Sequence, residues 1–227
     1  MRCIREHPLL ERYRGDAAFR ARASLAASLA MNSLYAAVKA VFGAVYHSQW
    51  MGLLAAYYLL VSLIRYALLR TVVKAPDGHQ MLGEWRRYRL CGIALLLLNQ
   101  VVAAVVFLMV RRGDGFRYPG FIVYAAALYA FYTVIMAVIH MMRFRAKESP
   151  VLAAAKAVNL ATAMVSILAL ETAMIDQFGT PEQAVFRTVT VSLSGMAVVA
   201  GLLAMGIVMI RRANEAIRTL KQKEHLK

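Results

Sequence analysis

Apolar residues recur along this chain in blocks of about twenty, the length that an α-helix needs to cross the hydrocarbon core of a bilayer. Of the 227 residues, 61% are hydrophobic, and the mean hydropathy is +0.56. The blocks predict six transmembrane helices, at residues 23–46, 50–69, 90–110, 121–142, 150–175 and 185–210. We therefore expect an all-α integral membrane protein.

Lys and Arg outside the blocks fall mainly on one side of the predicted membrane. They occupy the N-terminal arm, the second-to-third connection from Thr71 to Arg89, the fourth-to-fifth connection and the C-terminal tail. Because basic loops stay in the cytoplasm, both termini should be cytoplasmic, and we expect the cytoplasmic membrane of a bacterium. The organisation is then a basic arm (1–22), a transmembrane domain (23–210) and a basic cytoplasmic helix (211–227).

The net charge of +15 comes from basic residues next to the apolar blocks. This placement indicates contact with anionic lipids at the cytoplasmic face and argues against nucleic acid as a partner. The sequence carries no nucleotide-binding glycine loop, no Ser/His/Asp set and no HExxH motif, so we expect neither an enzyme nor a bound cofactor.

The fifth block begins with Ser149 and Pro150, in SPVLAAAKAVNLATAMVSI. Serine is a good N-cap, and proline suits the first helical position, where its missing N–H costs nothing. Small residues and scattered polar groups follow, a composition typical of a helix packed inside a bundle. If the chain carries transport chemistry, we expect it on this helix.

Four stretches resemble the transmembrane domain of the cation diffusion facilitator (cation-efflux) family. They are Asn32-x6-Lys39-x3-Gly43 in the first span, Pro76-x-Gly78-His79 before the third, the fifth-span segment above, and GIVMIRRANEAIRTL at the end of the sixth. The resemblance implies a cation-efflux-like bundle of six helices and a homodimer. Small residues that allow close helix approach, Gly195, Ala200 and Gly201, fit such pairing.

The family holds its ion with two i,i+4 pairs of His or Asp, one on the second helix and one on the fifth. The resemblance places Tyr57 and Val61, and Val158 and Thr162, at these positions. None of the four is a ligand that zinc prefers, and the family's cytoplasmic metal-binding domain is not part of this sequence. We therefore predict no high-affinity metal site at the midplane.

Five polar side chains inside the spans are candidate functional groups, because ionisable and amide groups are costly in a bilayer. Lys39 and Glu171 have similar depth near the outer side, so they are candidates for an ion pair, either static or responsive to protons or cations, unless each snorkels separately. Lys156 is near enough to the inner surface to snorkel. Asn32 and Asn159 suit hydrogen bonds between helices or the lining of a substrate path.

Two functions fit these features. One is a transporter that resembles cation-efflux proteins, has a degenerate metal site and carries a proton, a monovalent cation or a small solute. The other is a non-transporting scaffold, sensor or partner subunit that keeps the fold. The missing metal ligands favour the second, and the intramembrane Asn, Lys and Glu favour the first.

Overall fold

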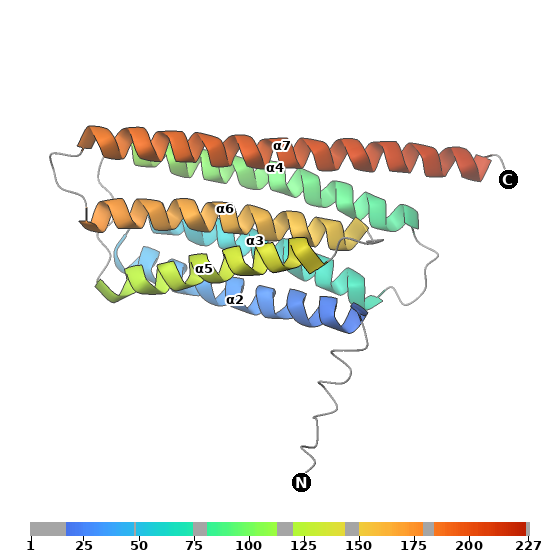
Figure 1. Cartoon of the computed structure of the whole chain (residues 1–227), viewed down its shortest axis with the longest axis horizontal. Helices are drawn as coiled ribbons and strands as arrows, with labels where there is room; N and C mark the ends of the chain where they lie inside the picture. The colour runs from blue at the N-terminus through green and yellow to red at the C-terminus, as the bar shows by residue number, and fades with distance from the viewer. Residues whose placement is uncertain are drawn as a thin grey trace, which may run out of the picture.

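The structure is a computed structural model that describes residues 17–47, 49–74, 81–112, 120–143, 150–178 and 184–225. These residues form six helices and no strand: α2 (Ala17–Val45), α3 (Gln49–Lys74), α4 (Met81–Arg112), α5 (Gly120–Arg143), α6 (Pro150–Phe178) and α7 (Ala184–His225). The helices lie roughly along one axis and alternate in direction, so α2 begins and α7 ends at the same end of the bundle (Figure 1). We call this the terminal end. The predicted all-helical fold is confirmed.

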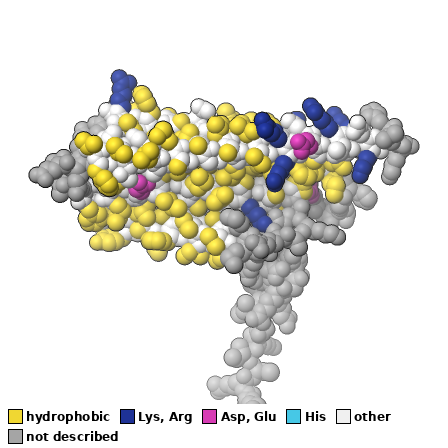
Figure 2. Space-filling view, turned by 45° about the horizontal axis from the view of Figure 1, so that its top comes forward, with side chains coloured by type: hydrophobic (Ala, Val, Ile, Leu, Met, Phe, Trp, Pro, Cys, Tyr) yellow, Lys and Arg dark blue, Asp and Glu magenta, His cyan; other side chains and the backbone are white. Residues whose placement is uncertain are grey.

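Five of the helices are long and apolar enough to span a membrane: α2, α3, α4, α6 and α7. In α5, the apolar stretch within the part searched is Ala126–Ile139. Figure 2 shows an apolar surface along much of the bundle, with Lys and Arg gathered toward the terminal end. These features are those of an integral membrane protein.

α2, α3, α4 and α7 extend past the predicted spans at the terminal end. The connection predicted from Thr71 to Arg89 is largely helical, because α3 continues to Lys74 and α4 begins at Met81. The C-terminal tail that was predicted to be helical continues α7, whose 42 residues give a length of about 63 Å. Ala213 and Ile217 are buried in this extension. Their burial stabilises α7 past the predicted span, where few apolar residues favour helix packing.

The helix ends largely follow local sequence signals. Pro150 is the first residue of α6, as predicted, while Ser149 lies outside the described residues. His47 has a φ of 47°, a left-handed conformation that ends α2 before α3 begins at Gln49. A Cβ on Gly43 would lie 3.1 Å from the Gly52 backbone nitrogen, so glycine allows α2 and α3 to approach closely beside this turn.

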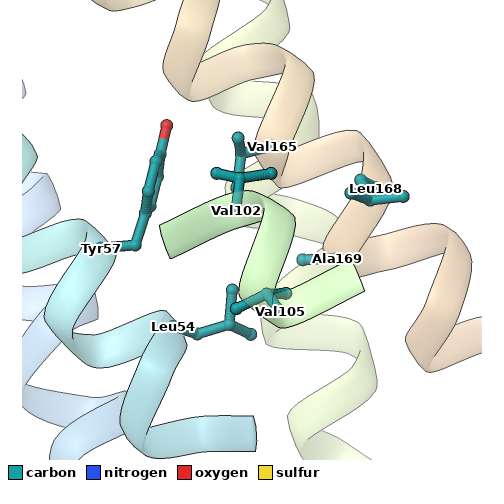
Figure 3. A pocket seen from close by; sticks show the side chains of 7 residues that line it. All are labelled: Leu54, Tyr57, Val102, Val105, Val165, Leu168 and Ala169. Atoms are coloured by element: carbon teal, nitrogen blue, oxygen red, sulfur yellow. The ribbon is translucent and has the colours of Figure 1, made fainter. Parts of the chain in front are cut away.

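The bundle has two parts that meet along α6. α4 packs most extensively on α7, and α2 packs on α3, while α6 contacts α3, α4, α5 and α7 (Figure 1). At the junction of α3, α4 and α6, apolar side chains leave a pocket of only about 10 Å³ (Figure 3). That volume is about one water molecule, so this junction is closely packed.

Candidate functional site

Buried polar side chains gather mainly on α2, α3, α5 and α6. Among the described residues they are Ser28, Asn32, Lys39, Ser62, Arg65, Asn99, Thr133, Asn159, Thr162, Ser166 and Thr172, of which Asn99 alone belongs to α4. Polar groups at membrane depth cost free energy unless they are paired or used. The interior of these four helices is therefore the candidate site.

The four positions taken from the family resemblance come together where α3 faces α6. Tyr57, Val61, Val158 and Thr162 are each at most 1% exposed. The Tyr57 hydroxyl donates to the Ala161 carbonyl at 3.3 Å, and Thr162 receives a 3.2 Å hydrogen bond from Arg65 Nη2. Within the part of the chain searched, no group of three or more His, Cys, Asp or Glu could hold a metal ion. The four positions form a helix contact in which a guanidinium is the nearest charge.

Arg65 is a candidate site residue that sequence reasoning missed. It is 4% exposed and lies inside the second apolar span. Its Nε has no hydrogen-bond acceptor among the described residues. Leaving a buried donor unpaired typically costs about 1–3 kcal/mol, and more when the group is charged. The available signal was simple: an arginine within an apolar span is by default a functional hypothesis.

Four tyrosines connect Arg65's surroundings to α2 and α5, and we call them the tyrosine cluster: Tyr35, Tyr57, Tyr58 and Tyr129. The Tyr35 and Tyr129 rings are stacked, with centroids 3.8 Å apart. The Tyr35 and Tyr58 rings are T-shaped, with centroids 4.8 Å apart. Tyr57 and Tyr58 are T-shaped at 5.2 Å. These contacts join three helices, so which rings meet could not be derived from sequence spacing.

Asn32 and Lys39 bring α2 into this arrangement. The Tyr129 hydroxyl donates a hydrogen bond to Asn32 Oδ1, and Asn32 Nδ2 has no acceptor among the described residues. Lys39 is 3% exposed, and its Nζ lies 5.3 Å from the Tyr35 ring centroid. Such a cation–π contact stabilises a lysine that has lost its water. Two of the five predicted intramembrane residues thus adjoin the tyrosine cluster.

A cavity of about 420 Å³ lies between α2 and α5, beside the tyrosine cluster. Lys39, Tyr35, Tyr129 and Tyr132 give it polar groups and aromatic surface, and the rest of the lining is apolar. Known small-molecule sites measure about 300–1,000 Å³ and combine apolar walls with a few polar groups. The cavity has the size of a ligand site, its walls are almost wholly apolar, and the exposed Leu34 and Leu128 leave it open to the outside of the bundle.

The structure does not bring Lys39 and Glu171 together. Glu171 shares the outward face of α6 with Ile167 and Met174, which are 50% and 44% exposed. The opposite face of α6 packs into the bundle through Thr172 and Ala173. Lys39 instead lines the cavity on α2. Similar depth alone does not pair the two groups, because Glu171, itself half-buried, shares a helix face with exposed residues, whereas Lys39 is on the cavity side of α2.

The remaining predicted polar residues are both on α6. Lys156 is half-buried and near the first turns of the helix, a position from which a lysine can snorkel. Asn159 is buried near Val158 and Thr162. Neither lines the cavity between α2 and α5.

Two of the three small residues expected at a dimer interface, Gly195 and Gly201, lie against other helices of the same chain. A Cβ on Gly195 would lie 2.6 Å from Val106 Cγ1 on α4, and one on Gly201 would lie 2.6 Å from Met164 Cε on α6. Ala200 is exposed. These glycines explain how α7 seats against the bundle, and the homodimer stays a prediction.

No family model, no curated protein and no solved structure matches this chain. The fold and the site define the class as an all-helical integral membrane protein with a cavity between α2 and α5 that is lined by apolar and aromatic side chains and by Lys39.

Proposed function

We propose that this protein is a small membrane carrier whose substrate, an organic solute, binds between α2, α3, α5 and α6. The observation that carries the proposal is the cavity of about 420 Å³ bordered by the buried Lys39 and the tyrosine cluster. Secondary transporters commonly place the substrate within the bilayer, where polar groups from several helices converge.

The two-part construction of the bundle supports this proposal. Glycine contacts fix α7 on α4, whereas α2 and α5 have the cavity between them. Alternating access needs one group of helices to move against another around the bound substrate. The α4/α7 pair suits the fixed part, and α2 and α5 suit the moving part.

Buried charge argues against a metal ion as the substrate. Among the described residues, the charged side chains in the buried class are Lys39 and Arg65, and both are cations. A divalent cation entering this region would meet two like charges in a low dielectric, and within the part of the chain searched no group of three or more His, Cys, Asp or Glu could hold it. A proton or monovalent cation meets the same repulsion, so the organic solute is the favoured cargo.

The alternative is a scaffold or partner subunit that does not transport. The closely packed junction of α3, α4 and α6, with its pocket of only about 10 Å³, favours this alternative because substrate has no room there (Figure 3). A carrier must open that contact or pass its substrate on the α2/α5 side.

The experiment is uptake into liposomes that contain the purified full chain. Labelled benzenesulfonate, phenyltrimethylammonium and glucose represent anionic, cationic and neutral solutes, and Zn²⁺ and K⁺ represent metal cargo. We expect uptake of an organic solute and none of either metal. Ala126→Trp should abolish uptake by filling the cavity, whereas Ala204→Trp, on an exposed position of α7, should not. Uptake of Zn²⁺ alone, or of nothing, contradicts the proposal.

A further inference from the structure

Two buried hydrogen-bond donors in this interior have no acceptor among the described residues. They are Arg65 Nε on α3 and Asn32 Nδ2 on α2, in side chains that are 4% and 2% exposed. Buried donors in native proteins are nearly always satisfied, so an unpaired donor calls for an explanation. Two of them in one membrane interior indicate a missing acceptor.

Tyr129 connects the cavity to the helices that carry the two donors. It lines the cavity, its hydroxyl donates a hydrogen bond to Asn32, and its ring lies 5.6 Å, centroid to centroid, from that of Tyr58. Arg65 follows Tyr58 by two turns on the same face of α3. Neither Arg65 nor Asn32 lines the cavity itself, whereas Lys39 does.

We propose that the substrate is an organic anion whose acidic group binds Arg65 and Asn32 while its apolar body fills the cavity. This inference rests on the proposed function and names its substrate class. A carboxylate or sulfonate offers acceptors for both donors, and a guanidinium binds such groups with good geometry. The tyrosine rings and the aliphatic side chains of Met31, Leu34 and Val38 provide the apolar contact.

The charge of the site selects among solutes of one shape. An anion neutralises the buried positive charge of Arg65. A neutral solute leaves that charge uncompensated, and a cation brings a second positive charge next to it. Discrimination by a buried charge is strong because water does not screen it. We therefore expect binding to depend on charge more than on the size of the apolar body.

The test measures binding to the full chain in nanodiscs of phosphatidylcholine, so that transport is not required. Labelled benzenesulfonate is the probe, and benzamide and phenyltrimethylammonium are the neutral and cationic competitors. We expect benzenesulfonate to bind at least tenfold more tightly than either competitor. Equal or tighter binding of benzamide or phenyltrimethylammonium overturns the inference.

Variants locate the site. Arg65→Gln should weaken benzenesulfonate binding at least tenfold, whereas Arg70→Gln, the same change at an exposed position five residues along α3, should leave it unchanged. Asn32→Asp keeps the acceptor for Tyr129 but replaces the donor with a negative charge, and it should also weaken anion binding at least tenfold. Retained affinity in the folded Arg65 or Asn32 variant overturns the inference, and the Asn32 variant decides if Arg65→Gln does not fold.

Uptake into liposomes separates this inference from the proposed function. If benzenesulfonate binds but is not taken up, the anion site stands and the carrier proposal fails. If phenyltrimethylammonium is taken up and benzenesulfonate is neither bound nor taken up, the carrier stands and the anion site fails. Competition by dodecanoate distinguishes the source of the anion: stronger competition than that of unlabelled benzenesulfonate indicates a fatty acid entering from the bilayer, and weaker competition indicates an acid entering from water.

Discussion

Single residues show where sequence reasoning reached the site and where it stopped. Asn32 and Lys39 were identified because polar groups at membrane depth are rare, and both lie beside the cavity. The same rule applies to Arg65, but it was not applied at that position. The tyrosine cluster could not be predicted, because its contacts depend on the relative rotation of α2, α3 and α5.

At Thr162 we predict a loss of stability that a matched threonine does not show. Thr162 and Thr172 are both buried on α6, and both hydroxyls bond a carbonyl four residues earlier. Only Thr162 of these two accepts the hydrogen bond from Arg65. Thr162→Val should therefore cost about 1–3 kcal/mol more than Thr172→Val, because it leaves another donor of the guanidinium unpaired. Thermal unfolding in detergent measures both, and equal losses contradict the role given to Arg65.

For Lys39 and Glu171 we predict independent effects. The sequence suggested a coupled pair, but Glu171 faces outward on α6 and Lys39 lines the cavity on α2. Side chains without shared partners have additive effects, within about 0.3–0.5 kcal/mol. The stability losses of Lys39→Met and Glu171→Gln should add in the double variant. A double variant more stable than this sum restores the ion pair.

At the scale of elements, the sequence predicts which helices exist and in what order, but it predicts their lengths and mutual contacts less well. Apolar blocks of about twenty residues predict spans directly, and all six correspond to helices. The apolar blocks do not show where a helix ends outside the membrane, so the N-terminal extension of α4 was missed, whereas the helix at the C-terminal end of α7 was predicted. Their helical state depends on contacts between the two, such as the Arg89 to Asn214 hydrogen bond of 3.4 Å.

For the α4/α7 contact we predict that a methyl group on Gly195 is destabilising. The new Cβ would lie 2.6 Å from one Val106 methyl and 2.9 Å from the other, and a β-branched side chain has little freedom to move away. Overpacking of this kind typically costs about 1–3 kcal/mol. Gly52→Ala is the control, because nothing lies within 4 Å of its added Cβ, and alanine is the better helix former. Unfolding midpoints that fall equally in both variants would show that α7 does not seat closely on Val106.

At the scale of the whole molecule, the charge pattern and the fold support one arrangement in the membrane. The alternating helices bring the start of α2 and the end of α7 to one end of the bundle (Figure 1), where Lys and Arg gather on the visible face (Figure 2). Because basic ends stay in the cytoplasm, we propose that the terminal end is cytoplasmic and meets anionic lipids there.

Cysteine labelling tests this orientation. In a background with Cys3→Ser and Cys91→Ala, Gln49→Cys and Lys223→Cys each introduce one thiol at an exposed position. An impermeant reagent added to whole cells should label residue 49 and should label residue 223 only after lysis. The reverse pattern would place the termini outside.

The central claim is that the cavity between α2 and α5 holds an organic anion against Arg65 and Asn32. The most direct measurement is a crystal structure of the full chain with 4-bromobenzenesulfonate, in which anomalous scattering locates the bromine. We predict a bromine peak among the apolar residues that line this cavity, with the sulfonate within hydrogen-bond distance of Arg65 and Asn32. A bromine peak elsewhere in the bundle, or none at a concentration that saturates binding in nanodiscs, would contradict the account.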